Sequence, residues 1–176
     1  MQKTCHIKKY SPMLVGYIAI FLIVGIVSIE NASAQGSLNF TPTQQAIENS
    51  PALNNLLFGV NSSVHISTGG VSLSSNEVMP LVAYCDADAF NQLYLTDAIF
   101  ASVKALYITV SDSPANATLD LTLLSSFTQL EYINIDFTYE ACGNMTSTTC
   151  LLPLVQQMIQ LGNTPMNVFY QLVIPQ

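Results

Sequence analysis

Two stretches of the sequence share one pattern of apolar residues at an offset of 27: Phe100-Ala-Ser-Val-Lys-Ala-Leu-Tyr-Ile108 and Phe127-Thr-Gln-Leu-Glu-Tyr-Ile-Asn-Ile135. Each begins with a phenylalanine, has an aliphatic residue three positions later, and ends in a run in which aliphatic and other side chains alternate. Apolar side chains three or four residues apart indicate a helix, whereas alternation is typical of a strand. We therefore expect each stretch to be the end of a helix followed by a strand, and the chain to repeat this unit.

The same alternation of strands and helices continues along the chain after residue 60. The expected strands cover residues 64–66, 78–85, 105–110, 131–137 and 167–174, and the expected helices cover residues 96–103, 119–130 and 151–161. Alternation with connections of this length predicts an α/β fold, with helix–strand repeats, a small, mostly parallel sheet and right-handed crossovers. In this sheet, Leu106, Ile108, Ile133 and Ile135 should be buried on adjacent parallel strands.

An N-terminal helical segment is expected before the repeats. Thr41-Pro42-Thr43-Gln44 has the form of a capping box with proline at the first helical position, so Thr41 is the expected N-cap. Ser50-Pro51 repeats this start signal before three leucines at helical spacing, and Gly59 ends the pattern.

The two related stretches resemble the F-x-x-L-x-x-L-x-L core of leucine-rich repeats, whose unit is one short strand plus one helical return. The segment 123–135 looks most like this core, and the resemblance covers about 45 residues. It implies a stack of repeats that binds another protein. The sequence departs from the family because no repeat carries the Asn or Cys expected after the strand, and because two or three repeats are few for a solenoid. A compact α/β sandwich of similar local units is therefore the favoured interpretation, and the repeat stack is the alternative.

The first 34 residues have the form of a secretory signal peptide. An uncharged apolar run, 13–29, is followed by the small-residue site Ala32-Ser33-Ala34, and three lysines precede it: Lys3, Lys8 and Lys9. The expected organisation is a cleaved signal peptide, 1–34, and a single α/β domain, 35–176, that is secreted or periplasmic. An uncleaved anchor is the alternative, because a run of about 17 residues reaches the lower limit for a membrane span.

The composition is apolar and acidic. Half of the residues are hydrophobic and 9% are charged, which excludes a disordered chain. Residues 35–176 contain ten acidic residues and a single basic one, Lys104. Such a surface repels nucleic acids and anionic lipids, so we expect no nucleic-acid partner and, after signal cleavage, no membrane association.

Three cysteines remain after the expected cleavage, namely Cys85, Cys142 and Cys150. An exported protein is exposed to oxidising conditions, in which a disulfide is the usual state. Cys142 and Cys150 flank a polar, turn-forming stretch and are predicted to pair. Cys85 ends an apolar strand and is expected to be a buried thiol, although its pairing with either of the others is the alternative.

The sequence contains few groups that support catalysis. His65 is the only histidine after residue 34 and is interpreted as a surface side chain, and neither a nucleophile elbow nor a phosphate-binding loop is present. Asp86, Asp88 and Asp97 are spaced like the first, third and last ligands of a calcium loop, but Phe90 and Asn91 occupy positions that an EF-hand fills differently. The three are therefore weak metal candidates, and helix N-caps within a solvated loop are the favoured interpretation. No cofactor is expected.

Two classes of function follow from these residues. The favoured one is an exported, non-catalytic interaction module that binds another protein or a cell-surface component through the polar face of its sheet or its loops. Tyrosine side chains are of the kind that interfaces use: Tyr84, Tyr94, Tyr107, Tyr132, Tyr139 and Tyr170. The alternative is a carboxylate-dependent hydrolase of a neutral glycan, which needs a pair of acids. A buried acid pair with a raised pKa would favour the enzyme, and exposed aromatic side chains without a cleft would favour the module.

Overall fold

The computed structural model describes residues 37–74, 79–111, 117–143, 148–160 and 165–173. Contacts divide the chain into two units, Met1–Ala34 and Gln35–Gln176. The expected signal peptide and its cleavage site lie outside the described residues. The fold given below is that of the second unit.

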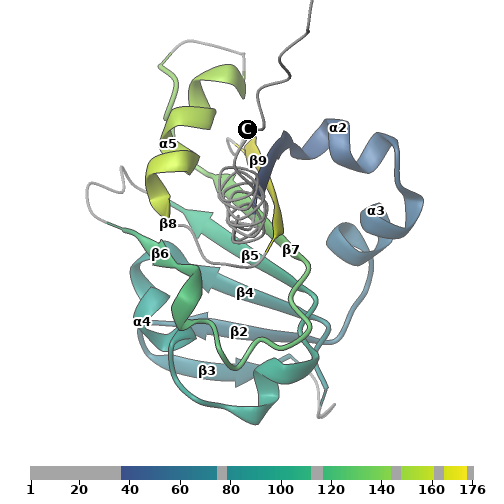
Figure 1. The fold of residues 1–176 in the computed structure, drawn as a ribbon, viewed down its shortest axis with the longest axis vertical. Helices are drawn as coiled ribbons and strands as arrows, with labels where there is room; N and C mark the ends of the chain where they lie inside the picture. The colour runs from purple at the N-terminus through teal and green to yellow at the C-terminus, as the bar shows by residue number, and fades with distance from the viewer. Residues whose placement is uncertain (1–36, 75–78, 112–116, 144–147, 161–164, 174–176) are drawn as a thin grey trace, which may run out of the picture. The chain divides into compact units, whose positions relative to one another are not determined.

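The described residues form a seven-stranded sheet in the order β1-β9-β7-β5-β4-β2-β3 (Figure 1). Its strands are β1 (Leu38–Pro42), β2 (Ser63–Ser67), β3 (Gly70–Leu73), β4 (Val82–Asp86), β5 (Ala105–Val110), β7 (Tyr132–Phe137) and β9 (Met166–Leu172). All neighbouring strands are parallel except β2 and β3. The predicted mixed α/β fold with a mostly parallel sheet is confirmed.

The strands β2, β4, β5, β7 and β9 lie side by side in chain order, so each connection leads to the adjacent position in the sheet. The N-terminal strand β1 is the exception, because it pairs in parallel with β9, with Leu38 opposite Met166. The antiparallel strand β3 follows β2 through a tight turn in which Gly70 has a φ of 123°. Only glycine adopts this backbone conformation without strain.

The connecting segments contain short helices and a second, two-stranded sheet. The helices are α2 (Thr43–Glu48), α3 (Pro51–Phe58), η1 (Ala87–Ala89), α4 (Phe90–Leu93), η2 (Ala98–Ser102), η3 (Leu121–Leu123), η4 (Thr148–Cys150) and α5 (Leu151–Met158). The small sheet pairs β6 (Leu119–Asp120) with β8 (Ile159–Gln160). In Figure 1, α2 and α3 lie to the right of the strands, whereas α4 and α5 lie to the left.

One face of the seven-stranded sheet forms the main core with the connecting segments. The four predicted core residues are fully buried on β5 and β7, with Leu106 opposite Ile133 and Ile108 opposite Ile135. The segments that lead into β5 and β7 meet on this face of the sheet, where the rings of Phe100 and Phe127 stack with centroids 4.6 Å apart and planes at 7°. These two phenylalanines begin the two related sequence stretches, so the sequence repeat is also a repeat in space.

The opposite face of the sheet is only partly covered. Leu53 and Leu57 of α3 pack against Val82, Ala105 and Phe169 in a second, smaller core. The buried Thr43 hydroxyl of α2 donates a hydrogen bond of 2.8 Å to Asn134 Oδ1 on β7. We call the part of this side beyond α2 and α3 the open face.

Two local expectations were wrong, and one helix is shorter than expected. Thr41 is not an N-cap, because it lies in β1, where pairing with β9 takes up the backbone, and α2 begins at Thr43. The helix expected over 119–130 is replaced by β6, the single turn η3 and further turns. The Asp120 carboxylate accepts a hydrogen bond from the Thr122 amide and so starts the short helix η3, and the turns that follow bury Phe127 in the core. The helix expected over 96–103 is the shorter 3₁₀ helix η2.

Candidate functional site

Two rows of side chains run across neighbouring strands on this side of the sheet, from the open face to the part that α2 and α3 cover. Side chains two residues apart on a strand lie on the same face of a sheet, and the strand register places them in line. The first row is His65, Tyr84, Tyr107 and Asn134, and the second is Asp86, Thr109, Asp136 and Gln171.

The rings of the first row lie against one another across β2, β4 and β5, with His65 stacked on Tyr84 and Tyr84 tilted against Tyr107. The centroids of His65 and Tyr84 are 5.0 Å apart with planes at 16°, and those of Tyr84 and Tyr107 are 5.2 Å apart with planes at 34°. Phe58, at the end of α3, stands edge-on to Tyr107 at 6.3 Å and 79°. The Tyr107 hydroxyl donates a hydrogen bond of 2.6 Å to the Leu57 carbonyl and so fixes α3 to the sheet.

A cavity of about 370 Å³ lies between the end of α3 and these strands, lined by Leu57, Phe58, Gly59, Tyr84, Tyr107, Thr109 and Asp136. Gly59 permits the close approach of the chain after α3, since a Cβ there would lie 2.3 Å from the Asn55 carbonyl oxygen. Asn61 secures the same turn, because its Nδ2 donates to the Asn55 and Leu56 carbonyls at 3.0 Å. The cavity is thus built by rigid elements on both sides.

Asp136 is the carboxylate of this cavity and is held by two amides. Asn134 Nδ2 and Gln171 Nε2 donate to Asp136 Oδ1 at 2.6 Å and 2.9 Å. Burial raises the pKa of Asp136, while the hydrogen bonds from Gln171 and Asn134 act in the opposite direction. Burial, and then the Asp136 charge, raise the pKa of both Tyr84 and Tyr107. The tyrosines therefore present neutral hydroxyls beside a partly desolvated acid.

The three predicted metal candidates do not assemble into a ligand set. Asp86 ends β4 and Asp88 lies in η1, both with exposed side chains. Asp97 is the N-cap of η2, where its Oδ1 accepts a hydrogen bond of 3.0 Å from the Ile99 amide. Within the described ranges, no group of three or more His, Cys, Asp or Glu side chains could hold a metal ion.

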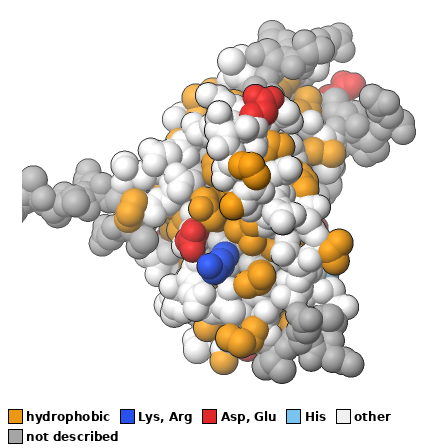
Figure 2. Space-filling view, turned by 90° about the vertical axis from the view of Figure 1, so that its right-hand side faces the viewer, with side chains coloured by type: hydrophobic (Ala, Val, Ile, Leu, Met, Phe, Trp, Pro, Cys, Tyr) orange, Lys and Arg blue, Asp and Glu red, His pale blue; other side chains and the backbone are white. Residues whose placement is uncertain are grey.

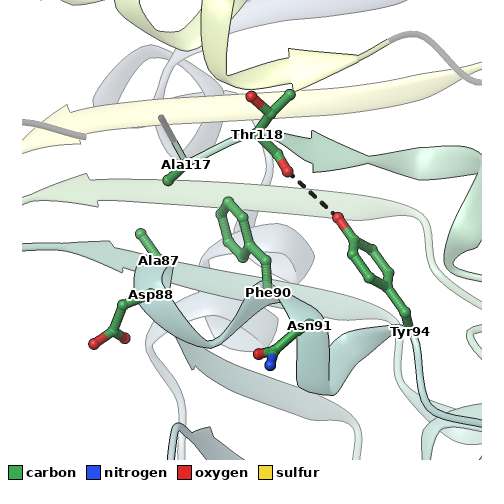
Figure 3. Close-up of a pocket in the computed structure, with 7 residues that line it drawn as sticks. All are labelled: Ala87, Asp88, Phe90, Asn91, Tyr94, Ala117 and Thr118. Atoms are coloured by element: carbon green, nitrogen blue, oxygen red, sulfur yellow. Dashed lines mark hydrogen bonds between the residues drawn. The ribbon is translucent and has the colours of Figure 1, made fainter. Parts of the chain in front are cut away.

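Asp88 lines a second cavity, of about 410 Å³, at the carboxyl end of β4 (Figure 3). Figure 3 shows the Phe90 ring directed toward Ala117, whereas the side chains of Asp88 and Asn91 point away from that ring. The Tyr94 hydroxyl is already engaged, because it donates to the Thr118 carbonyl and accepts from the Asp120 amide. This cavity offers fewer convergent polar groups than the one on the open face.

The cysteines are arranged as the sequence predicts. Cys142 and Cys150 form a disulfide, with their Cα atoms 5.8 Å apart. Cys85 is a buried thiol on β4 that donates to the Asp86 carbonyl at 3.3 Å. Burial raises its pKa to about 12. Because the thiolate is the reactive form, Cys85 is unsuited to act as a nucleophile.

Sequence reasoning pointed to the polar face of the sheet without singling out the residues of the cavity. Asn134 and Asp136 alternate with buried isoleucines on β7, and this alternation was the available signal. The position of Phe58 beside Tyr107 had no sequence signal, because it depends on how α3 packs on the sheet. His65 is exposed as predicted, and its stacking on Tyr84 was not foreseen.

Charged side chains are few on the face that Figure 2 shows, where hydrophobic and uncharged side chains predominate. The one basic side chain of the described residues, Lys104, lies 3.8 Å from Glu131. Among the described helices, none has the length and apolar composition needed to cross a bilayer. The chain matches no protein-family model, and comparisons with curated proteins and with solved structures found no match.

Proposed function

We propose that the protein is an exported, non-catalytic binding module that contacts another protein or a cell-surface component through the open face of its sheet. One observation carries the proposal, namely the cavity of about 370 Å³ that combines aromatic walls with a single, hydrogen-bonded carboxylate. Sites that bind ligands are typically concave and largely apolar, with a few well-placed polar groups.

Hydrogen bonds hold the polar side chains beside the cavity in place, which suits a binding site. Tyr107 is anchored to α3, and Asp136 is anchored through Asn134 to Thr43 of α2. A pre-organised face loses little side-chain freedom when it binds. The order of β4, β5 and β7 in the sheet also supports the resemblance to leucine-rich repeats, which stack one strand per repeat.

Export is part of the proposal, and the secreted or periplasmic location follows from the expected signal peptide. The disulfide between Cys142 and Cys150 supports it, because disulfides persist in oxidising compartments. We expect the exported protein to begin at Gln35, which intact-mass measurement of protein from the host medium or periplasm will show. Recovery of the full-length chain in the membrane fraction would contradict this.

A carboxylate-dependent hydrolase of a neutral glycan is the second candidate, because burial raises the pKa of Asp136 as a general acid requires. A glycosidase needs a second carboxylate across the substrate. Among the residues that line the cavity, Asp136 is the only acid. Asp86 lies in the same row with Thr109 between them, but its side chain is exposed and does not line the cavity. The binding module is therefore the better supported of the two.

The test is a pull-down from the native host with three forms of the exported protein: wild type, Tyr84→Ser on the open face, and Leu95→Ser as the control. Leu95 is an exposed apolar residue that follows α4. A partner retained by wild type and by Leu95→Ser but lost with Tyr84→Ser supports the proposal. Equal capture by all three forms, or release of sugar from a host glycan that Asp136→Asn abolishes, would overturn it.

A further inference from the structure

The cavity between α3 and the sheet combines an acid with apolar walls and contains no basic group. We propose that it binds the ammonium group of a lysine side chain presented by the partner protein. The inference rests on the proposed function and specifies the chemistry that the open face recognises.

The Asp136 carboxylate has one oxygen left for a ligand. Both of its hydrogen bonds, from Asn134 and from Gln171, end on Oδ1. Oδ2 accepts no hydrogen bond from the described residues, and none of their buried side-chain oxygens lacks a partner. Asp136 is half-buried and lines the cavity, so Oδ2 is the oxygen left for a ligand there. The Thr109 hydroxyl lines the same cavity and offers a second acceptor.

The backbone adds negative potential on the other side of the cavity. Leu57 and Phe58 are the last residues of α3, and the carbonyl end of a helix carries a partial negative charge. The last turn of α3 contains no basic residue. Lys104 lies beside Glu131 and does not line the cavity. A cation from a partner would thus meet the Asp136 carboxylate and, beside it, the negative end of α3, in a cavity that no basic residue lines.

The walls suit the aliphatic part of a lysine side chain. Leu57, Phe58 and the two tyrosine rings supply apolar surface beside the acid. Lysine commonly packs its methylene groups on such surface while its charged end reaches a polar group. The ring planes of Tyr84 and Tyr107 lie at 34° to each other and those of Phe58 and Tyr107 at 79°, so the three rings do not form one flat platform.

Two other ligand classes fit less well. Arginine binds carboxylates best through both oxygens, and Asp136 Oδ1 already accepts two bonds. A neutral sugar would leave the Asp136 carboxylate without a counter-charge in a cavity that no basic residue lines. A single ammonium group, which needs one acceptor oxygen at a time, matches the cavity.

The test is an NMR titration of the protein, expressed from its full sequence and labelled with ¹⁵N, with short blocked peptides that differ only in a central lysine, norleucine or arginine. We expect the lysine peptide to shift the amide signals of Gly59, Thr109 and Asp136. Its Kd should be about tenfold lower than that of the norleucine peptide, which has the same stem without the charge. The arginine peptide should bind more weakly than the lysine peptide.

Two variants make the test specific. Asp136→Asn keeps an acceptor oxygen for Asn134 and Gln171, so the fold is retained, and it should remove the difference between lysine and norleucine. Asp86→Asn removes the same charge from the same row outside the cavity and should leave the difference unchanged. Equal binding of the lysine and norleucine peptides, or shifts at these residues by a neutral oligosaccharide alone, would overturn the inference. If the Tyr84→Ser pull-down still loses its partner in that case, the binding module stands and only the lysine inference fails.

Discussion

Replacing Ile133 by alanine tests whether the related stretches form one packed unit. Ile133 is fully buried on β7 and lies between Leu106 of β5 and Val168 of β9 in the sheet register. The substitution deletes three carbon atoms, each worth about 0.8 kcal/mol when buried. The cavity left behind adds to this, because strands on both sides hold their side chains in place. We expect a loss of about 3 to 4 kcal/mol in the free energy of unfolding, within the range found for such deletions.

Urea unfolding followed by circular dichroism measures this loss, provided that the slope of the transition matches that of the wild type. The matched control is Val173→Ala, which also shortens a β-branched side chain, but at a site 40% exposed just after β9. It should cost less than about 0.5 kcal/mol. A loss for Ile133→Ala below about half a kilocalorie, or no larger than that of the control, would refute the packing of β5, β7 and β9 described above.

Three further predictions concern other parts of the fold. Peptide mapping of the unreduced protein should recover Cys142 linked to Cys150. Reduction should lower the free energy of unfolding by about 2.5 kcal/mol, on the chain-entropy model for so short a loop. Recovery of Cys85 in a disulfide would contradict the assignment. Because burial raises the folded pKa of Asp136, its contribution to stability is complete below the unfolded pKa and is lost as pH rises through the higher folded pKa. Asp136→Asn should therefore gain stability relative to wild type as pH increases over that window, and a difference independent of pH in urea titrations would count against it. A double-mutant cycle with Phe100→Leu and Phe127→Leu should give a coupling of about 0.5–1.5 kcal/mol for the stacked rings, whereas strictly additive losses would show that the stack contributes nothing specific.

The elements that could be predicted from the sequence are those whose signal is local. The strand β5 was predicted with its observed bounds, and β7 to within one residue, because aliphatic and other side chains alternate there. The disulfide was also predictable, since its cysteines flank a short turn-forming stretch. The helix expected over 119–130 failed because its apolar spacing also suits a chain of turns anchored by Phe127 in the core.

Other features depend on partners that are distant in the sequence. The strand β1 was missed because the residue opposite Leu38 is Met166, and the local Thr41-Pro42 signal pointed to a helix instead. The cavity beside Asp136 could not be predicted from the sequence either, because the residues that line it are distant from one another along the chain. Its residues come from α3, β4, β5 and β7, and only the packing of α3 on the sheet brings Phe58 to the tyrosines.

The pairing of β1 with β9 sets the order in which the molecule can be completed. Residues 38–42 emerge from the ribosome long before their neighbours at 166–170, so the first strand has no place in the sheet until the last one has been synthesised. The helix α2 follows β1 directly and depends on the same event for its position against Asn134. Closing so long a loop is entropically costly and slow. The Gln171 amide that holds Asp136 is therefore in place only after β9 has joined the sheet, and a chain that is cut before β9 leaves β1 and the outer edge of β7 unpaired.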